Sequence, residues 1–166
     1  ITNWYDPETL LRALDAAVRK EPRLKLFFLA KRHPNPLLPE FDLANEAVRL
    51  SDELGLTGRH VFFNEEWVDY RRIGQYFREA DIGVSIHRTH FETMFSFRIR
   101  LLEYLKYGLP ILCTRGDYFA ALVDRDGLGV TVESGDREGL TQALLELAAG
   151  VEERKIMKSR LAGVKP

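Results

Sequence analysis

The sequence has one cysteine, so no disulfide can form within the chain. That residue, Cys113, lies in the apolar run that begins at Pro110, which favours a buried thiol over a reactive one. No run of about 18 apolar residues indicates a transmembrane helix, and no signal-peptide pattern is seen. A reducing cytoplasmic setting is therefore expected, with membrane association of the full-length protein left open.

The chain also lacks a sizeable net charge. Its 24 Lys and Arg balance 25 Asp and Glu, which leaves no electrostatic case for nucleic acid as a partner. His87 and His90 do not make a convincing zinc pair, because Cys113 is the only thiol and no H-x-x-x-H spacing occurs. No metal and no cofactor are expected. With 166 residues, 45% of them hydrophobic, the composition is that of one soluble globular domain.

Apolar runs alternate with amphipathic segments along the whole chain. The predicted strands are residues 24–30, 61–63, 81–86, 111–113 and 130–132. The predicted helices are residues 7–21, 41–54, 70–80, 96–107, 117–123 and 138–149, with a charged helical tail at 151–161. The connections are too long for hairpins, so we expect an α/β fold. It is a Rossmann-like, doubly wound parallel sheet with helices on both faces.

The first predicted element is a helix that no strand precedes. Asp6 is a good N-cap for it, and Pro7 suits the first helical position. In a doubly wound sheet such a helix follows a central strand, so we expect the first strand to be missing. Residues 1–166 would then be a single domain forming the second half of a larger protein. The alternative is that this helix packs at the edge of the sheet.

Residues 81–110 place a loop rich in polar and titratable side chains after a predicted strand. The strand 81–86 leads into a polar and aromatic loop, residues 87–95, and then into the helix 96–107. Ligands of open α/β sheets bind beyond the carboxyl ends of strands, beside helix N-termini. We therefore expect the functional site in the loop between Ile86 and Ser96.

The helix 96–107 is apolar around most of its circumference, which predicts packing on nearly all sides. Its narrow polar stripe includes Arg100 and Glu103. Because an unpaired buried carboxylate is costly, Glu103 either pairs with Arg100 or accepts hydrogen bonds from ligand hydroxyls. Acidic residues that bind ribose in dinucleotide folds are the physical precedent for the second reading.

Arg98 stands on the apolar side of the first turn of the same helix. There its guanidinium and the unpaired amides of the helix end would form an anion site. The alternative is a structural ion pair of Arg98 with Glu92 or Asp81.

At this point the pattern resembles a known family. The segment from Glu103 to Pro110 resembles the E-A-x-x-x-G-x-P signature of retaining glycosyltransferases with the GT-B fold, the glycosyl transferases group 1. The segments 80–85 and 135–136 match further signatures of this family in the same order. The resemblance covers nearly the whole chain. It involves only the C-terminal, nucleotide-sugar-binding domain of such enzymes.

The resemblance implies transfer of a sugar from a nucleoside diphosphate sugar to an acceptor hydroxyl, with retention of anomeric configuration. The acceptor, whether a sugar, a lipid-linked glycan or a protein, is not defined by it. It also implies that the isolated domain is inactive without an N-terminal domain that binds the acceptor. The donor-binding residues would be Glu103 at the ribose, Asn64 and Glu65 at the base, and the backbone amides of residues 94–97, among them Phe95, Ser96 and Phe97, at the phosphates. Arg98 or Arg100 is the candidate to compensate for the basic residues that usually hold the diphosphate and are largely missing here.

The sequence departs from the family at the first glutamate of the E-x7-E motif, because that position holds Phe95. Glu92 is the candidate to replace this carboxylate in catalysis, and His87 is expected to approach the transferred sugar or the phosphates. Two alternatives remain open: a GT-B-like nucleotide-sugar epimerase, and a non-enzymatic flavodoxin-like regulatory or binding module. The second would need an aspartate at a strand end near an acidic cluster, and no such cluster follows the strand 81–86.

Overall fold

A computed structural model describes residues 4–29, 42–64, 68–95 and 98–164. The strands are β1 (Leu26–Phe28), β2 (Val61–Phe63), β3 (Gly83–Ser85), β4 (Ile111–Thr114) and β5 (Gly129–Val132). The helices are α1 (Pro7–Val18), α2 (Asp42–Glu53), α3 (Tyr70–Glu79), α4 (Phe91–Phe95), α5 (Ile99–Tyr107), α6 (Tyr118–Asp126), α7 (Arg137–Ala149) and α8 (Val151–Gly163).

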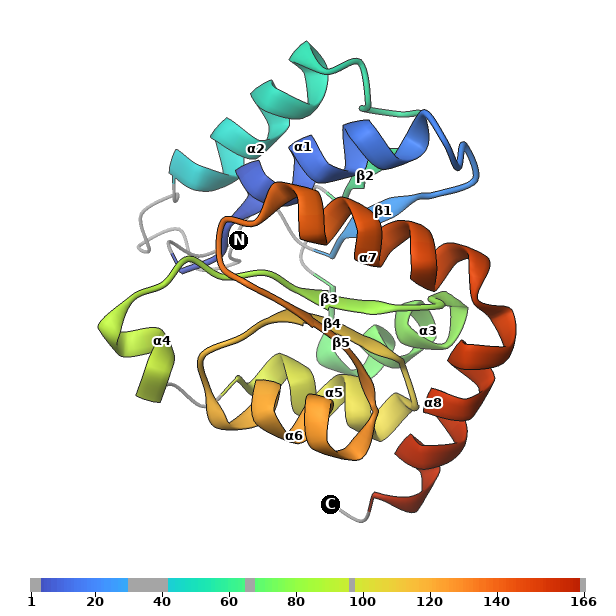
Figure 1. The fold of residues 1–166 in the computed structure, drawn as a ribbon. Helices are drawn as coiled ribbons and strands as arrows, with labels where there is room; N and C mark the ends of the chain where they lie inside the picture. The colour runs from blue at the N-terminus through green and yellow to red at the C-terminus, as the bar shows by residue number, and fades with distance from the viewer. Residues whose placement is uncertain (1–3, 30–41, 65–67, 96–97, 165–166) are drawn as a thin grey trace.

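The described strands are all parallel, which confirms the predicted fold class. β1 pairs with β2, with Leu26 opposite Val61. β4 lies between β3 and β5, with Ile111 opposite both Gly83 and Gly129. Helices α1, α2 and α7 lie on one side of the strands, and α3, α5 and α6 lie on the other (Figure 1). The carboxyl ends of β3, β4 and β5 share one edge, at the left of the view.

Two apolar cores hold these layers together. The larger one joins α1 and α7 to the upper face of both strand groups and includes the fully buried Leu11, Val61 and Leu112. The smaller one lies under β4 and includes Leu101 of α5 and Val123 of α6. Cys113 belongs to it and is fully buried, and this burial raises the pKa of the thiol to about 12. The expectation of a buried thiol is confirmed.

Aspartates define the starts of four helices. The side chains of Asp6, Asp69, Asp117 and Asp136 accept hydrogen bonds from backbone N–H groups in the first turns of α1, α3, α6 and α7. Pro7 follows at the first position of α1, where its missing N–H has no effect. The predicted cap at Asp6 is thus confirmed.

The strands form two separate ladders among the described residues, β1–β2 and β3–β4–β5. The amide of Leu26 donates to the carbonyl of His60, and the carbonyl of Phe28 accepts from the amide of Asn64. Phe27 lies between Leu26 and Phe28 in β1, and its backbone groups therefore point away from β2. Val84 likewise points away from β4, because the neighbouring Gly83 amide donates to Pro110. Within the described residues, no strand pairs with the outward edge of β1 or with that of β3.

Two details differ from the sequence-based predictions. The stretch expected to be a loop contains the short helix α4, and α5 begins at Ile99 rather than at Ser96. The prediction that the helix of residues 96–107 packs on nearly all sides is wrong, since Ile99 is 68% exposed and Leu102 is 38% exposed. An apolar residue on a helix wheel predicts burial only where another element covers that face.

Candidate functional site

The carboxyl ends of β3 and β4 hold a group of buried polar side chains. His87 follows β3, Thr114 ends β4, Arg98 precedes α5, and Asp117 precedes α6. The backbone amide of His87 donates to the Thr114 hydroxyl at 3.2 Å, and the Arg98 guanidinium donates through Nη2 to the Thr114 carbonyl at 3.2 Å. The predicted location of the site at the end of β3 therefore coincides with a polar cluster built from four segments of the chain.

Arg98 forms an ion pair through Nε with Oδ2 of Asp117, and these side chains are only 3% and 2% exposed. The structural alternative anticipated for Arg98 is thus the observed one, but with Asp117 as partner rather than Glu92 or Asp81. No sequence signal singled out Asp117, because 18 residues and a whole strand separate it from Arg98. The role of Arg98 as a direct ligand of the donor stays a prediction, and no part of its side chain reaches far into solvent.

His87 is buried beneath the ring of Tyr5, with ring centroids 4.5 Å apart. Its Nε2 lies 3.0 Å from the Ser85 hydroxyl. Burial, together with the positive charge of Arg98, lowers the pKa of His87 to about 4, so the imidazole is neutral at physiological pH. A catalytic role for His87 stays a prediction.

The loop after β3 is held by hydrogen bonds to two other parts of the chain, the segment before α1 and the residue that follows Glu133. The amide of Arg88 donates to the carbonyl of Trp4, and the amide of Asp6 donates to the carbonyl of Ile86. Ser134, just after β5, accepts from the Thr89 amide and donates to the His87 carbonyl. This network makes the loop a fixed part of the carboxyl edge.

Glu103 and Arg100 form the i,i+3 ion pair that was one of the two alternatives. The Glu103 side chain is 11% exposed and that of Arg100 is 36% exposed. The guanidinium of Arg100 also lies over the ring of Phe77 of α3, 5.9 Å from its centroid. Ribose binding by Glu103 and donor binding by Arg100 stay predictions, and the pair does not exclude either.

The remaining predicted site residues are less closely defined. Asn64 follows β2, and its side-chain amide donates to the Leu29 carbonyl at 3.3 Å. Phe95 ends α4, is 75% exposed, and contacts the ring of Phe91 at 5.1 Å between centroids. Glu92 lies within α4, but its side chain is outside the described part of the structure. Glu65, Ser96 and Phe97 lie outside the described residues.

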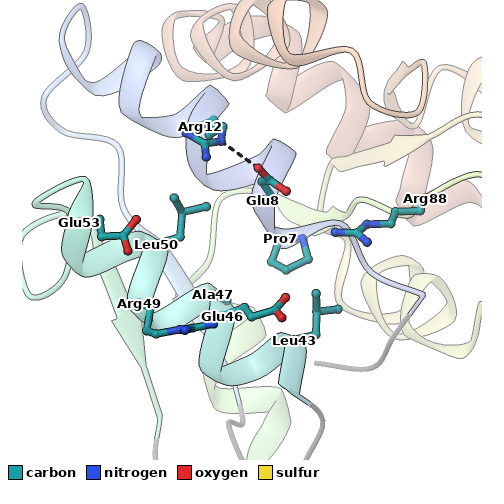
Figure 2. Close-up of a pocket in the computed structure, with 10 residues that line it drawn as sticks. All are labelled: Pro7, Glu8, Arg12, Leu43, Glu46, Ala47, Arg49, Leu50, Glu53 and Arg88. Atoms are coloured by element: carbon teal, nitrogen blue, oxygen red, sulfur yellow. Dashed lines mark hydrogen bonds and ion pairs between the residues drawn. The ribbon is translucent and has the colours of Figure 1, made fainter.

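A cavity of about 260 Å³ lies between α1 and α2. Figure 2 shows its lining residues, with the Arg12–Glu8 ion pair drawn at its upper rim. They are Pro7, Glu8, Arg12, Leu43, Glu46, Ala47, Arg49, Leu50, Glu53 and Arg88. Three arginines are matched there by three glutamates, so the lining has no net charge, and no predicted site residue belongs to it.

The fold and the buried edge cluster define a Rossmann-like α/β domain with a candidate ligand site at the carboxyl ends of its strands. The family model described as glycosyl transferases group 1 matches residues 2–149, and the chain belongs to this family. The resemblance seen in the sequence is thereby confirmed. No curated protein matches the sequence.

Solved structures share the fold at low sequence identity. One is the C-terminal domain of LpcC, a glycosyl transferase group 1 family protein from Francisella tularensis. It matches with 17% identity and a TM-score of 0.78, over 98% of this chain and 78% of that one. Another is HepE from Anabaena in complex with UDP-glucose, with 16% identity and a TM-score of 0.78, over 98% of this chain and 41% of HepE.

WaaG, a glycosyltransferase involved in lipopolysaccharide biosynthesis, matches with 18% identity and a TM-score of 0.71, over 94% of this chain and 38% of WaaG. The chain therefore spans about two fifths of HepE and WaaG. Within the described residues, no helix is long and apolar enough to cross a bilayer, and no group of three or more His, Cys, Asp or Glu side chains could hold a metal ion.

Proposed function

We propose that this chain is the donor-binding domain of a glycosyltransferase that moves a sugar from a nucleoside diphosphate sugar to an acceptor hydroxyl with retention. The observation that carries the proposal is the match to the glycosyl transferases group 1 over residues 2–149. The polar cluster at the carboxyl ends of β3 and β4 supports it, because donors bind at this edge in doubly wound folds. HepE, which shares the fold, has been solved with UDP-glucose and with UDP.

In this proposal Glu103 binds the ribose and Asn64 borders the base. The first-turn amides of α5 face the diphosphate, because an N-terminal helix end carries partial positive charge. These dipoles would stabilise the departing diphosphate electrostatically and without a metal ion. Glu92 and His87 remain the candidates near the transferred sugar.

Calorimetry of the chain with UDP, GDP and ADP, each beside its nucleoside, tests the proposal. We expect weak binding of one diphosphate and weaker binding of the matching nucleoside. If the full-length protein binds none of the three diphosphates, the proposal is wrong. Retention is tested separately by determining the anomeric configuration of the product that the full-length protein makes.

We further propose that the domain is the C-terminal half of a two-domain GT-B enzyme. Its sheet would be completed by a strand from upstream of Ile1. The strand order supports this: a central strand belongs between β1 and β3 in a doubly wound sheet, and the described ladders are separate at that place. Hydrogen exchange tests the proposal, since the amides of Phe27 and Val84 should be protected in the full-length protein and exchange faster in this chain. Equal exchange in both would contradict the added strand.

A further inference from the structure

Asp117 joins two helix starts at the carboxyl edge. Its Oδ1 accepts from the Ala120 amide at 2.8 Å, which caps α6, and its Oδ2 pairs with Nε of Arg98 at the start of α5. The Arg98 carbonyl in turn accepts from the amide of Leu101 in the first turn of α5. The carboxylate is thus connected to the backbone of both helices.

The Arg98 guanidinium extends this connection to the strands. Its Nη2 donates to the carbonyl of Thr114, whose hydroxyl accepts from the amide of His87. Because a guanidinium is planar and its donors have fixed directions, two bonded partners determine its orientation. One buried pair therefore sets the relative positions of α5, α6 and the ends of β3 and β4.

Stability alone does not account for this arrangement. Buried ion pairs are often replaceable by apolar residues without loss of stability. In the same cluster, Nη1 of Arg98 and Nδ1 of His87 are buried without a hydrogen-bond partner in the described structure. Buried unsatisfied groups are costly and uncommon, and each one in a native structure calls for an explanation such as a functional role.

We infer that Asp117 is a positioning residue for the donor diphosphate: through Arg98 it holds the first turn of α5 in the orientation that receives the phosphates. The inference rests on the proposed function. In this arrangement Arg98 acts as half of a neutral pair and not as a free cation.

The charge of the pair gives the inference an unusual test, because two models predict opposite signs. Asp117→Asn removes one negative charge beside the site and keeps a side-chain oxygen for the Ala120 cap. If Arg98 bound the diphosphate as a cation, the variant would bind it more tightly. If Asp117 positions the first turn of α5, the variant binds it more weakly.

The experiment compares calorimetric Kd values for UDP and for uridine, or for the diphosphate and nucleoside of the base that the wild type prefers. Asp117→Asn should bind the diphosphate at least ~10-fold more weakly, a loss of about 1.4 kcal/mol, with the nucleoside Kd unchanged. Asp136→Asn is the matched control. Asp136 caps α7 in the same way, through the Gly139 amide at 2.8 Å, but contacts no arginine in any described interaction. It should change neither Kd.

Tighter or unchanged diphosphate binding by a folded Asp117→Asn overturns the inference, as does an equal loss for the nucleoside. If circular dichroism shows that this variant does not fold, Arg98→Lys decides instead, because it keeps the charge and loses the planar fork. The lysine variant should lose diphosphate affinity selectively, and wild-type affinity would overturn the inference. If the wild-type chain and the full-length protein bind no diphosphate, the proposed function itself fails.

Discussion

Gly83 and Tyr104 provide the sharpest test of how the site is supported. Gly83 lies in β3, and a Cβ atom built there would lie 2.5 Å from Cγ of the Tyr104 ring. The ring is buried, and its hydroxyl donates to the carbonyl of Val84 at 2.9 Å. Because the ring rests on the strand at this point, only glycine leaves it enough room.

The substitution Gly83→Ala should lower the free energy of unfolding by about 1–3 kcal/mol, the usual cost of overpacking. For a chain of this length each kcal/mol corresponds to a change in Tm of roughly 2–4 °C. Tyr104→Phe keeps the ring and removes only the hydroxyl, so it should cost about 0.5–1.5 kcal/mol. Both values are measured by thermal and urea unfolding followed by circular dichroism.

A double-mutant cycle with Tyr104→Leu tests the reasoning directly. Once the ring is gone, Gly83→Ala should cost little, so a coupling free energy of about 0.5–3 kcal/mol is expected. Gly163→Ala is the control, because a Cβ atom there meets nothing within 4 Å. An alanine at position 83 that costs the same with tyrosine or leucine at position 104 would refute the explanation.

Three further perturbations have defined outcomes. The pKa of His87 is lowered to about 4 in the folded chain, so the unfolded state binds more protons between roughly pH 4 and 6.5 and stability should fall as the pH drops through that window. His87 contributes at most ~1.4 kcal/mol per pH unit to the slope of the free energy of unfolding against pH. The substitution His87→Gln should remove that contribution. Parallel curves of stability against pH for the wild type and this variant would contradict the reasoning. Cys113, fully buried and with its pKa raised to about 12, should react with a thiol reagent such as dithionitrobenzoate only after urea unfolding, and rapid reaction of the native chain would count against its burial. Asp6→Ala should cost about 1–2 kcal/mol in urea unfolding, because Asp6 is buried and accepts from both the amide and the hydroxyl of Thr9, whereas a change within ~0.3 kcal/mol would show that this cap is dispensable.

Local patterns predicted most of the fold. Helix starts at Asp6, Asp69 and Asp136 were predictable, because a capping side chain bonds to a backbone only two or three residues away. Parallel pairing followed from connection length. The extra helix α4 was missed, since its five residues carry no cap or periodicity strong enough to distinguish them from a polar loop.

The success of the side-chain predictions depended on whether the interacting partner is close in sequence or comes from another part of the fold. The Arg100–Glu103 pair was among the alternatives because its partners lie one helical turn apart. The partner of Arg98 was missed, because Asp117 comes from another helix and only the packing of α5 beside α6 brings the two together. The exposure of Ile99 shows the same limit, because no local pattern indicates which face of a helix lacks a neighbour.

The separation of the β1–β2 and β3–β5 ladders has a consequence for handling the protein. Around Phe27 and Val84, backbone groups face away from their own ladder, and such strand edges are templates for pairing with another chain. The Tyr104 hydroxyl donates to the Val84 carbonyl, which as a carbonyl can accept a second hydrogen bond. At high concentration the isolated chain would therefore be prone to edge-to-edge aggregation, a hazard that a strand seated between β1 and β3 would remove.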